Sequence, residues 1–309
     1  MQGLSNEGGS AVRRTLSGAL RGATGPLIGL LLLCLFLTLW TDTFFSVRNF
    51  LNILDQITVL GIIAVGMTLV ILIGGIDLAV GSALAMAVAI PIALGAAAAN
   101  GLVAGLFITR FNVPPFIATL AMMSVSRGLA NMITNGQQLT GFPDWFNPLA
   151  ITRHGGFLTL TVAVMLVVFV VGLLYLRYRE GGRILYAIGG NPEVARLAGI
   201  NVQRATVLVY VTCSFLAGLA GLMLAARLDS VQPSSGTGYE LDAIAAVVIG
   251  GTSLSGGTGG VGGTIIGVLI IGVLRNGLNL LSVSPFLQQV IIGLVILMAV
   301  VAETFRKRG

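Results

Sequence analysis

The sequence predicts an all-α polytopic membrane protein built around a single transmembrane domain. Of its 309 residues, 56% are hydrophobic and only 9% are charged, and the mean hydropathy is +0.98. Charged residues make up about a quarter of a soluble globular domain, so that class is excluded. Several runs of about 20 apolar residues are long enough to cross a hydrocarbon core of about 30 Å as helices.

The first span is predicted from Pro26 to Trp40, after Arg13, Arg14 and Arg21. Arginines before an apolar run are also found in signal peptides and twin-arginine signals. The run is followed by TDTFF and has no small-residue cleavage site. We therefore expect an uncleaved span, with residues 1–25 forming a cytoplasmic tail.

Further apolar segments follow, and charge orients them. They are residues 53–73, 83–108, 116–133, 157–176, 205–226 and the C-terminal part, 241–302. The loop 177–204 holds five arginines and the tail 303–309 reads ETFRKRG. Because Lys and Arg accumulate in cytoplasmic segments, this loop and both termini are expected in the cytoplasm, with residues 135–155 and 228–238 in the periplasm. The transmembrane domain is then 26–302.

The number of crossings between two cytoplasmic points must be even, and segment 83–108 breaks that rule. Counted as one span, it leaves five crossings before Arg177. Two crossings would repair the parity, but at 1.5 Å per residue the segment is too short for two full helices. We expect a shortened hairpin of two half-helices folded around Pro91. The alternative is that the sequence lacks residues here.

Loop 177–204 contains AIGGNPEVARLAGI, which predicts a short helix with both ends marked. Each marker suits its position in the helix. They are Asn191 as the N-cap, Pro192 in the first helical position, Glu193 at the positive end of the dipole, Arg196 in the last turn and Gly199 as the closing residue.

Val194, Leu197 and Ala198 should share one apolar face of this helix. Isolated helices of fewer than about 12 residues rarely persist in water, so something must pack on this one. A protein partner is the favoured candidate. A helix lying on the membrane surface or on its own spans is the alternative.

A glycine-rich break interrupts the C-terminal apolar part in VIGGTSLSGGTGGVGGTIIG. Glycine disfavours a helix by about 1 kcal/mol relative to alanine, so AIAAVVI and TIIGVLIIGVL are predicted to be separate helices. Such a break is tolerated at membrane depth only where protein or a water-filled cavity covers it. A tight packing joint is equally compatible with the pattern.

The glycines do not form a phosphate-binding loop, because a Walker A motif needs a lysine and the chain has only Lys307. An aspartyl protease using Asp77 and Asp242 is disfavoured, since each aspartate lies beside a chain break where it can cap a helix. ATP hydrolysis is thus expected on another subunit, and this chain is not expected to be an enzyme.

Few ionisable residues lie within the predicted spans, which suits a path for a neutral solute. They are Asp55, Asp77, Arg127, Asp242 and Arg275, several of them near span ends where capping or snorkelling is the alternative. His154 is the one histidine and lies in a predicted outer loop, so no metal site or proton relay is expected. Asn131, Asn276, Asn279 and Gln288 offer hydrogen bonds to hydroxyls, or caps. The scattered arginines form no basic face, so nucleic acid is not expected as a partner.

Five stretches resemble the permease subunits of bacterial ABC sugar importers of the ribose, xylose and arabinose group, above all the ribose type. They are AVGMTLVILIGGIDLAVGS, VPPFIATLAMMSVSRGLA, AIGGNPEVARLAGINVQR, GTGYELDAIAAVVIGGTSLSGGTGGVGGTIIGVLI and NGLNLLSVSPF. Together they span nearly the whole chain after Thr41. The chain departs from the family after GSALAMA, where such permeases usually carry a full extra helix.

The resemblance implies about ten transmembrane segments, some of them broken, in an inner-membrane homodimer. It also implies an ATPase bound through the cytoplasmic loop and a periplasmic sugar-binding protein, with no cofactor. The candidate coupling residues are Asn191, Pro192, Glu193, Val194, Arg196, Leu197 and Gly199. The candidate residues of the translocation path or its gate are Asp77, Ser82, Phe116, Arg127, Asp242, Gly250, Gly251 and Asn276.

The function expected from the sequence is therefore the sugar pathway of an ATP-driven importer. The alternative is a secondary transporter or channel that works without an ATPase. Secondary transporters often have two related halves and an intramembrane coupling site, and this sequence shows neither clearly.

Overall fold

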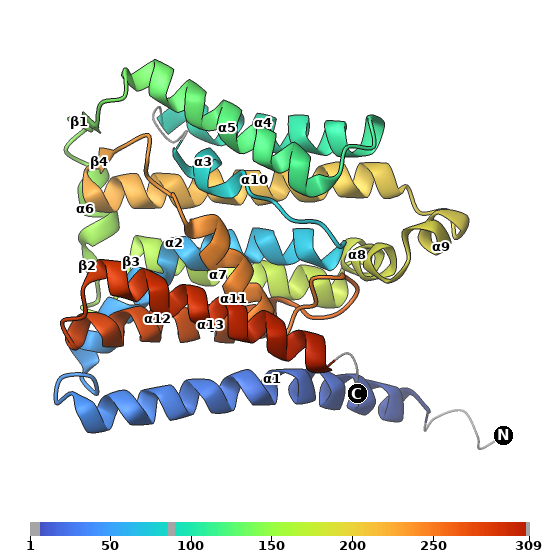
Figure 1. Cartoon of the computed structure of the whole chain (residues 1–309), viewed down its shortest axis with the longest axis horizontal. Helices are drawn as coiled ribbons and strands as arrows, with labels where there is room; N and C mark the ends of the chain where they lie inside the picture. Colours follow the sequence, from blue (N-terminus) through green and yellow to red (C-terminus); the bar gives the residue numbers. More distant parts are fainter. Residues whose placement is uncertain (1–6, 86–89, 307–309) are drawn as a thin grey trace.

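The structure, a computed structural model, describes residues 7–85 and 90–306 and is a bundle of helices lying along one long axis (Figure 1). The helices are α1 (Glu7–Trp40), α2 (Val47–Leu72), α3 (Val80–Ala85), α4 (Ile90–Arg110), α5 (Pro115–Thr134), α6 (Phe146–Ile151), α7 (Leu160–Tyr178), α8 (Glu180–Gly190), α9 (Pro192–Leu197), α10 (Val202–Leu228), α11 (Tyr239–Ile249), α12 (Val261–Leu280) and α13 (Pro285–Arg306). The predicted all-α fold is confirmed.

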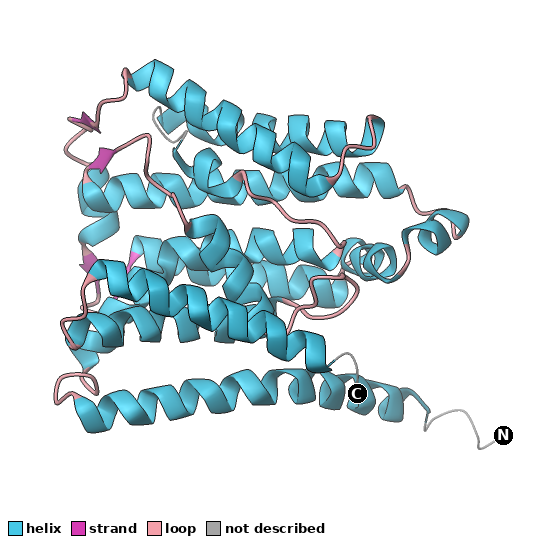
Figure 2. Ribbon diagram, viewed as in Figure 1, coloured by secondary structure: helices cyan, strands magenta, loops and turns pink. Residues whose placement is uncertain are grey.

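In the part of the chain that the structure describes, strands are confined to two short pairs at one end of the bundle (Figure 2). β1 (Leu139–Thr140) pairs antiparallel with β4 (Ser230–Val231), and β2 (Arg153–His154) pairs antiparallel with β3 (Leu158–Thr159). The first pair joins the two segments that the charge pattern assigned to one side of the membrane.

Six of the described helices are long and apolar enough to cross a membrane, namely α2, α5, α7, α10, α12 and the part of α4 from Ala93 to Arg110. Shorter apolar helices cover residues 24–40 of α1 and 285–301 of α13. Two more passes are interrupted: residues 73–85 end in the short α3, and residues 232–249 end in α11. The described chain thus runs along the bundle ten times, as the resemblance implied.

This path places the first described residues of α1, the end of α13 and both α8 and α9 at the same end of the bundle (Figure 1). The two strand pairs and α6 lie at the opposite end. The even number of passes required between the arginine-rich segments is therefore present in the fold.

The hairpin predicted around Pro91 is wrong. α4 is one continuous helix of 21 residues, and Pro91 is its second residue. Proline is tolerated in a first helical turn because the N–H it lacks would have no partner inside the helix. The additional pass comes instead from residues 73–85, which are mostly non-helical before α3 and therefore carry no helical signal.

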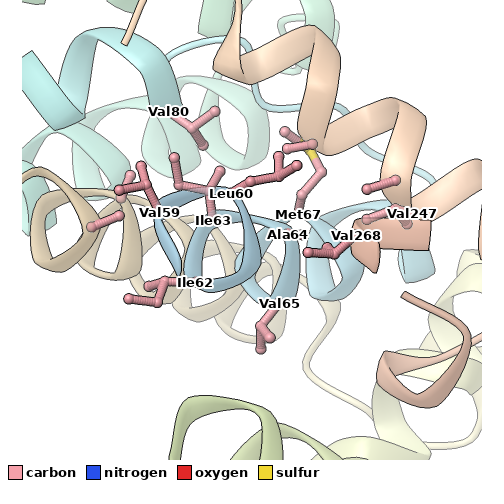
Figure 3. Packing of buried hydrophobic residues seen from close by; sticks show 14 of the residues in the cluster. Val59, Leu60, Ile62, Ile63, Ala64, Val65, Met67, Val80, Val247 and Val268 are labelled. Carbon is pink, nitrogen blue, oxygen red and sulfur yellow. The ribbon is translucent and has the colours of Figure 1, made fainter. Parts of the chain in front are cut away.

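α2 forms the centre of the bundle. Side chains on all sides of this helix are buried, from Val59 and Ile62 to Met67, and Val80, Val247 and Val268 from three other elements pack around it (Figure 3). A helix that is apolar on every side is stable only where neighbours cover it completely. This helix therefore organises the elements that carry the candidate sites.

Small residues let neighbouring helices approach closely. On α4, Gly101 and Gly105 face α10, and a Cβ at Gly105 would lie 2.9 Å from the Cα of Val207. On α2, a Cβ at Gly66 would lie 2.9 Å from the Cα of Cys213. Membrane helices associate through such contacts because the lipid provides no hydrophobic driving force between them.

Candidate functional site

The short helix predicted in loop 177–204 is confirmed as α9. The Asn191 side chain accepts hydrogen bonds from the backbone N–H groups of Glu193 (3.0 Å) and Val194 (3.1 Å). Pro192 is the first helical residue, and Gly199 closes the helix with a φ of +85°. The helix is one residue shorter than predicted, because Ala198 is its C-cap.

The apolar face of α9 is open. Leu197 is 88% exposed and Val194 is 60% exposed, whereas Ala195 is buried and attaches the helix to the rest of the loop. Arg196 pairs with Glu193 at 3.5 Å on the exposed surface. α9 therefore presents an unpartnered apolar side chain, Leu197, at the end of the bundle that also holds the first described residues of α1 and the end of α13.

A second helix in this loop, α8, was not anticipated from the sequence. Its buried residues are Gly182, Leu185 and Ile188, spaced three apart along one face. That spacing is a helical signal, but four glycines among the eleven residues weaken it, because glycine disfavours a helix. Asn191 ends α8 and caps α9, so the two helices are joined at one residue.

The glycine-rich break separates α11 from α12, as predicted. A Cβ at Gly250 would overlap the backbone of Gly263, and one at Gly267 would overlap that of Ala246. The small residues recur every four positions on both helices, so the two backbones touch. Gly251 has a φ of +90°, a conformation in which side-chain-bearing residues are strained.

Asp77 and Asp242, the aspartates of the two interrupted passes, each have a structural partner, while Oδ2 of Asp77 is buried without a hydrogen bond from the described part of the chain. Oδ1 of Asp77 accepts a hydrogen bond from the backbone N–H of Ala79 at 2.9 Å, just before α3. Ser82 donates its hydroxyl hydrogen to the carbonyl of Ala79 at 2.9 Å. Asp242 of α11 forms an ion pair with Arg275 of α12. These contacts hold the half-helices in place, and the structure does not arrange a pair of catalytic carboxylates from them.

Asn276 and Arg127, two other candidates for the translocation path, also form hydrogen bonds within the protein. Asn276 and Asn49 exchange side-chain hydrogen bonds of 3.0 and 2.9 Å, and both are buried. Arg127 donates to the carbonyls of Pro233 (2.7 Å) and Ser235 (3.3 Å), which ties α5 to the loop before α11. Asn276 and Arg127 therefore act first as links between elements.

α5 carries an exposed face that sequence reasoning did not single out. Ser124, Gly128 and Asn131 are all exposed along it, and Phe116 at its start is 52% exposed. The same helix also exposes large apolar side chains, among them Leu120, Val125 and Met132. Residues 124, 128 and 131 have the spacing of one face of a helix, and this pattern is present in the sequence.

Among residues 7–85 and 90–306, no three His, Cys, Asp or Glu side chains gather in a way that could hold a metal ion. The candidate sites in the described chain are the exposed helix α9 and the contacts between helices. Such features suit movement of helices and docking of a partner.

Comparison with known proteins agrees with this geometry. Residues 49–300 match the family model described as the permease component of branched-chain amino acid transport systems. The ribose import permease protein RbsC of Escherichia coli K12 is 47% identical over 296 residues, covering 90% of this chain and 92% of the relative. RbsC of Bacillus subtilis 168 is 46% identical with the same coverage. No solved structure matches the chain.

A third relative gives information on length. The L-arabinose transport system permease protein AraH of Escherichia coli K12 is 33% identical over 335 aligned positions, covering 100% of this chain and 99% of the relative. Since the chain has 309 residues and 335 exceeds 309 by 26, about 26 aligned positions have no counterpart here.

Proposed function

Because the chain belongs to the family of permease components of branched-chain amino acid transport systems, we propose that it forms the translocation pathway for a ribose-like monosaccharide in an ABC importer. The observation that carries the proposal is the 47% identity to a ribose import permease over 90% of the chain. The open apolar face of α9 supports it, because a membrane subunit without a nucleotide site needs a surface on which a separate ATPase can dock.

The end of the bundle that holds α8, α9, the first described residues of α1 and the end of α13 faces the cytoplasm in this proposal. Its loop carries Arg177, Arg179, Arg183, Arg196 and Arg204, and cytoplasmic loops are enriched in arginine. The opposite end, with the β1–β4 pair, then faces the periplasm and receives the sugar-binding protein. The chain thereby spans the inner membrane with its N- and C-termini in the cytoplasm.

Docking of the ATPase is assigned to the coupling residues, Asn191 to Leu197 with Gly199. The cap at Asn191 and the exposed pair of Glu193 and Arg196 hold α9 as a preformed helix. An amphipathic helix entering an apolar groove is a common mode of protein recognition. Leu197 would be the side chain that enters the groove of the ATPase.

The sugar path is assigned to the exposed face of α5, where a second copy of the chain covers it. Polar groups exposed to lipid are unfavourable, and small or polar residues favour contacts between helices or a water-filled route. Ser124 and Asn131 offer hydrogen-bonding groups to the hydroxyls of a neutral sugar. Asp77, Ser82, Asp242, Gly250 and Gly251 act as parts of the gate by shaping the two interrupted passes, and Asn276 acts by linking α12 to α2.

The test is uptake by liposomes containing the purified chain with its ATPase, supplied with the binding protein and radiolabelled sugars. We expect ATP-dependent accumulation of ribose or another pentose, with hexoses as comparison substrates. The control is the same complex with an ATPase whose Walker A lysine is replaced by alanine. Uptake that continues without ATP or with the inactive ATPase would contradict the proposal and indicate a secondary transporter or channel.

A further inference from the structure

The C-terminal end of α8 lies directly on the glycine-rich break. A Cβ added at Gly189 would overlap both the carbonyl oxygen of Leu72, the last residue of α2, and the backbone nitrogen of Gly257. A Cβ at the next residue, Gly190, would meet nothing within 4 Å. The close approach therefore depends on one glycine of the pair.

Hydrogen bonds fix the same contact. The backbone N–H of Gly257 donates to the carbonyl of Leu72 at 2.9 Å, which gives a partner to one carbonyl that the end of α2 leaves unpaired. The hydroxyl of Tyr186 on α8 donates to the carbonyl of Gly259 at 2.9 Å. Partial burial raises the pKa of Tyr186, so the phenol keeps the proton that it donates at physiological pH.

We call Leu72, Gly74, Gly256, Gly257 and Gly259 the α8 seat. Gly256 and Gly257 have φ values of +82° and +74°, and a Cβ at Gly256 would lie 2.8 Å from the nitrogen of Gly74. The seat is therefore a contact between backbones, with no flexible side chains to absorb a displacement. Backbone contacts of this kind transmit movement because packed elements shift together.

Both interrupted passes meet at this seat. The pass 73–85 begins immediately after Leu72, and the glycine break is the connection from α11 to α12. α9 continues from α8 through the single residue Asn191. A displacement of α9 is thus connected through α8 to the only two passes of the described chain that are not continuous helices.

We propose that the α8 seat transmits the movement of the ATPase to the two interrupted passes, with Gly189 and Tyr186 as the positioning residues of this transmission. The inference rests on the proposed function, because it assumes that an ATPase docks on α9. It assigns to the glycine-rich break a role in coupling rather than in binding a ligand. It also explains why α8 ends in glycine although that residue is unfavourable in a helix.

The decisive comparison is Gly189→Ala with Gly190→Ala, in the complex with the ATPase. The readout is the stimulation of ATP hydrolysis by sugar-loaded binding protein, measured per complex that retains its ATPase on a column. We expect Gly189→Ala to reduce stimulation about tenfold or more, since overpacking against backbone must displace α8. Gly190→Ala should stay within about twofold of wild type. Retention of the ATPase should be unchanged in both variants, because α9 is intact.

A purely structural role for Gly189 would lower the yield of complex and leave stimulation per complex at the wild-type value, and that result would overturn the inference. Tyr186→Phe provides a second test if Gly189→Ala does not assemble. It removes one hydroxyl and should reduce stimulation per complex while the chain stays monodisperse; unchanged stimulation in Tyr186→Phe would also overturn the inference. The proposed function fails separately, if the wild-type complex shows no ATP-dependent uptake of any sugar.

Discussion

Single residues in the interior of this protein mainly serve contacts between helices. Asn276 pairs with Asn49, and Asp242 pairs with Arg275, so the polar groups that sequence reasoning offered to the substrate already have partners. Glycines also serve contacts between helices, because Gly250 and Gly263 allow the backbones of α11 and α12 to touch. An unpaired polar group in this environment would cost several kcal/mol, which explains the pairing.

The glycine contact between α11 and α12 can be tested with two adjacent residues. A Cβ at Gly263 would overlap the carbonyl oxygen of Gly250, whereas a Cβ at Gly262 would make an ordinary contact of 3.7 Å with Leu173. Gly263→Ala should therefore destabilise the protein by about 1–3 kcal/mol through overpacking. Gly262→Ala should change stability by less than about 0.5 kcal/mol. Thermal unfolding in detergent measures both, and equal melting temperatures for the two variants would contradict a packed joint.

At the scale of elements, α8 and α9 differ in the way they are held. α8 buries Leu185 and Ile188 against the bundle and rests on the end of α2. α9 buries only Ala195 and is kept helical by the cap at Asn191. A helix of six residues gains little from its own hydrogen bonds, so the cap at Asn191 is an important part of its stability.

Leu197 is the residue of α9 with which docking can be tested. Leu197→Asp would place an unpaired carboxylate in the apolar contact, which should cost a few kcal/mol and weaken ATPase binding by about a hundredfold or more. The fold should survive, because Leu197 is 88% exposed in the chain alone. Leu197→Met keeps an apolar side chain and should retain the ATPase. Column retention and size-exclusion profiles measure these effects, and full retention by the aspartate variant would exclude α9 as the docking helix.

At the scale of the whole molecule, the described residues combine eight apolar helices with two interrupted passes, all oriented along one axis. Both ends of the described chain and the α8–α9 pair lie at one end, and the strand pairs lie at the other (Figure 1). About 26 positions of AraH have no counterpart in this chain, yet the chain still makes an even number of passes. The pass 73–85 achieves this with few residues, because an extended backbone spans about twice the distance per residue of a helix.

Orientation can be tested with single cysteines in a background in which Cys34 and Cys213 are replaced by alanine. A thiol reagent that cannot cross the membrane should label Gln137→Cys in intact cells, because Gln137 is exposed at the end assigned to the periplasm. Glu193→Cys should be labelled only after the cells are opened. Labelling of Glu193→Cys in intact cells would reverse the orientation and remove α9 from the cytoplasm.

The sequence by itself determined the fold class, the positions of most spans and the α9 helix with its caps. These features depend on local chemistry: long apolar runs, the Asn-Pro start and Gly199, each of which acts within a few residues of the chain. The glycine-rich break could also be predicted from the sequence, because consecutive glycines disfavour a helix wherever they occur.

Only the tertiary structure decided the roles of the interior residues and the route of the pass 73–85. Asn276 forms hydrogen bonds with Asn49, which is 227 positions away in the sequence. Gly189 packs against the backbone of Leu72 and Gly257. The turn predicted at Pro91 is wrong because the largely extended pass 73–85 leaves no periodic pattern in the sequence, whereas proline is a strong local signal for a break. Contacts between distant segments follow from how the helices pack, and no local pattern records which backbone a glycine will meet.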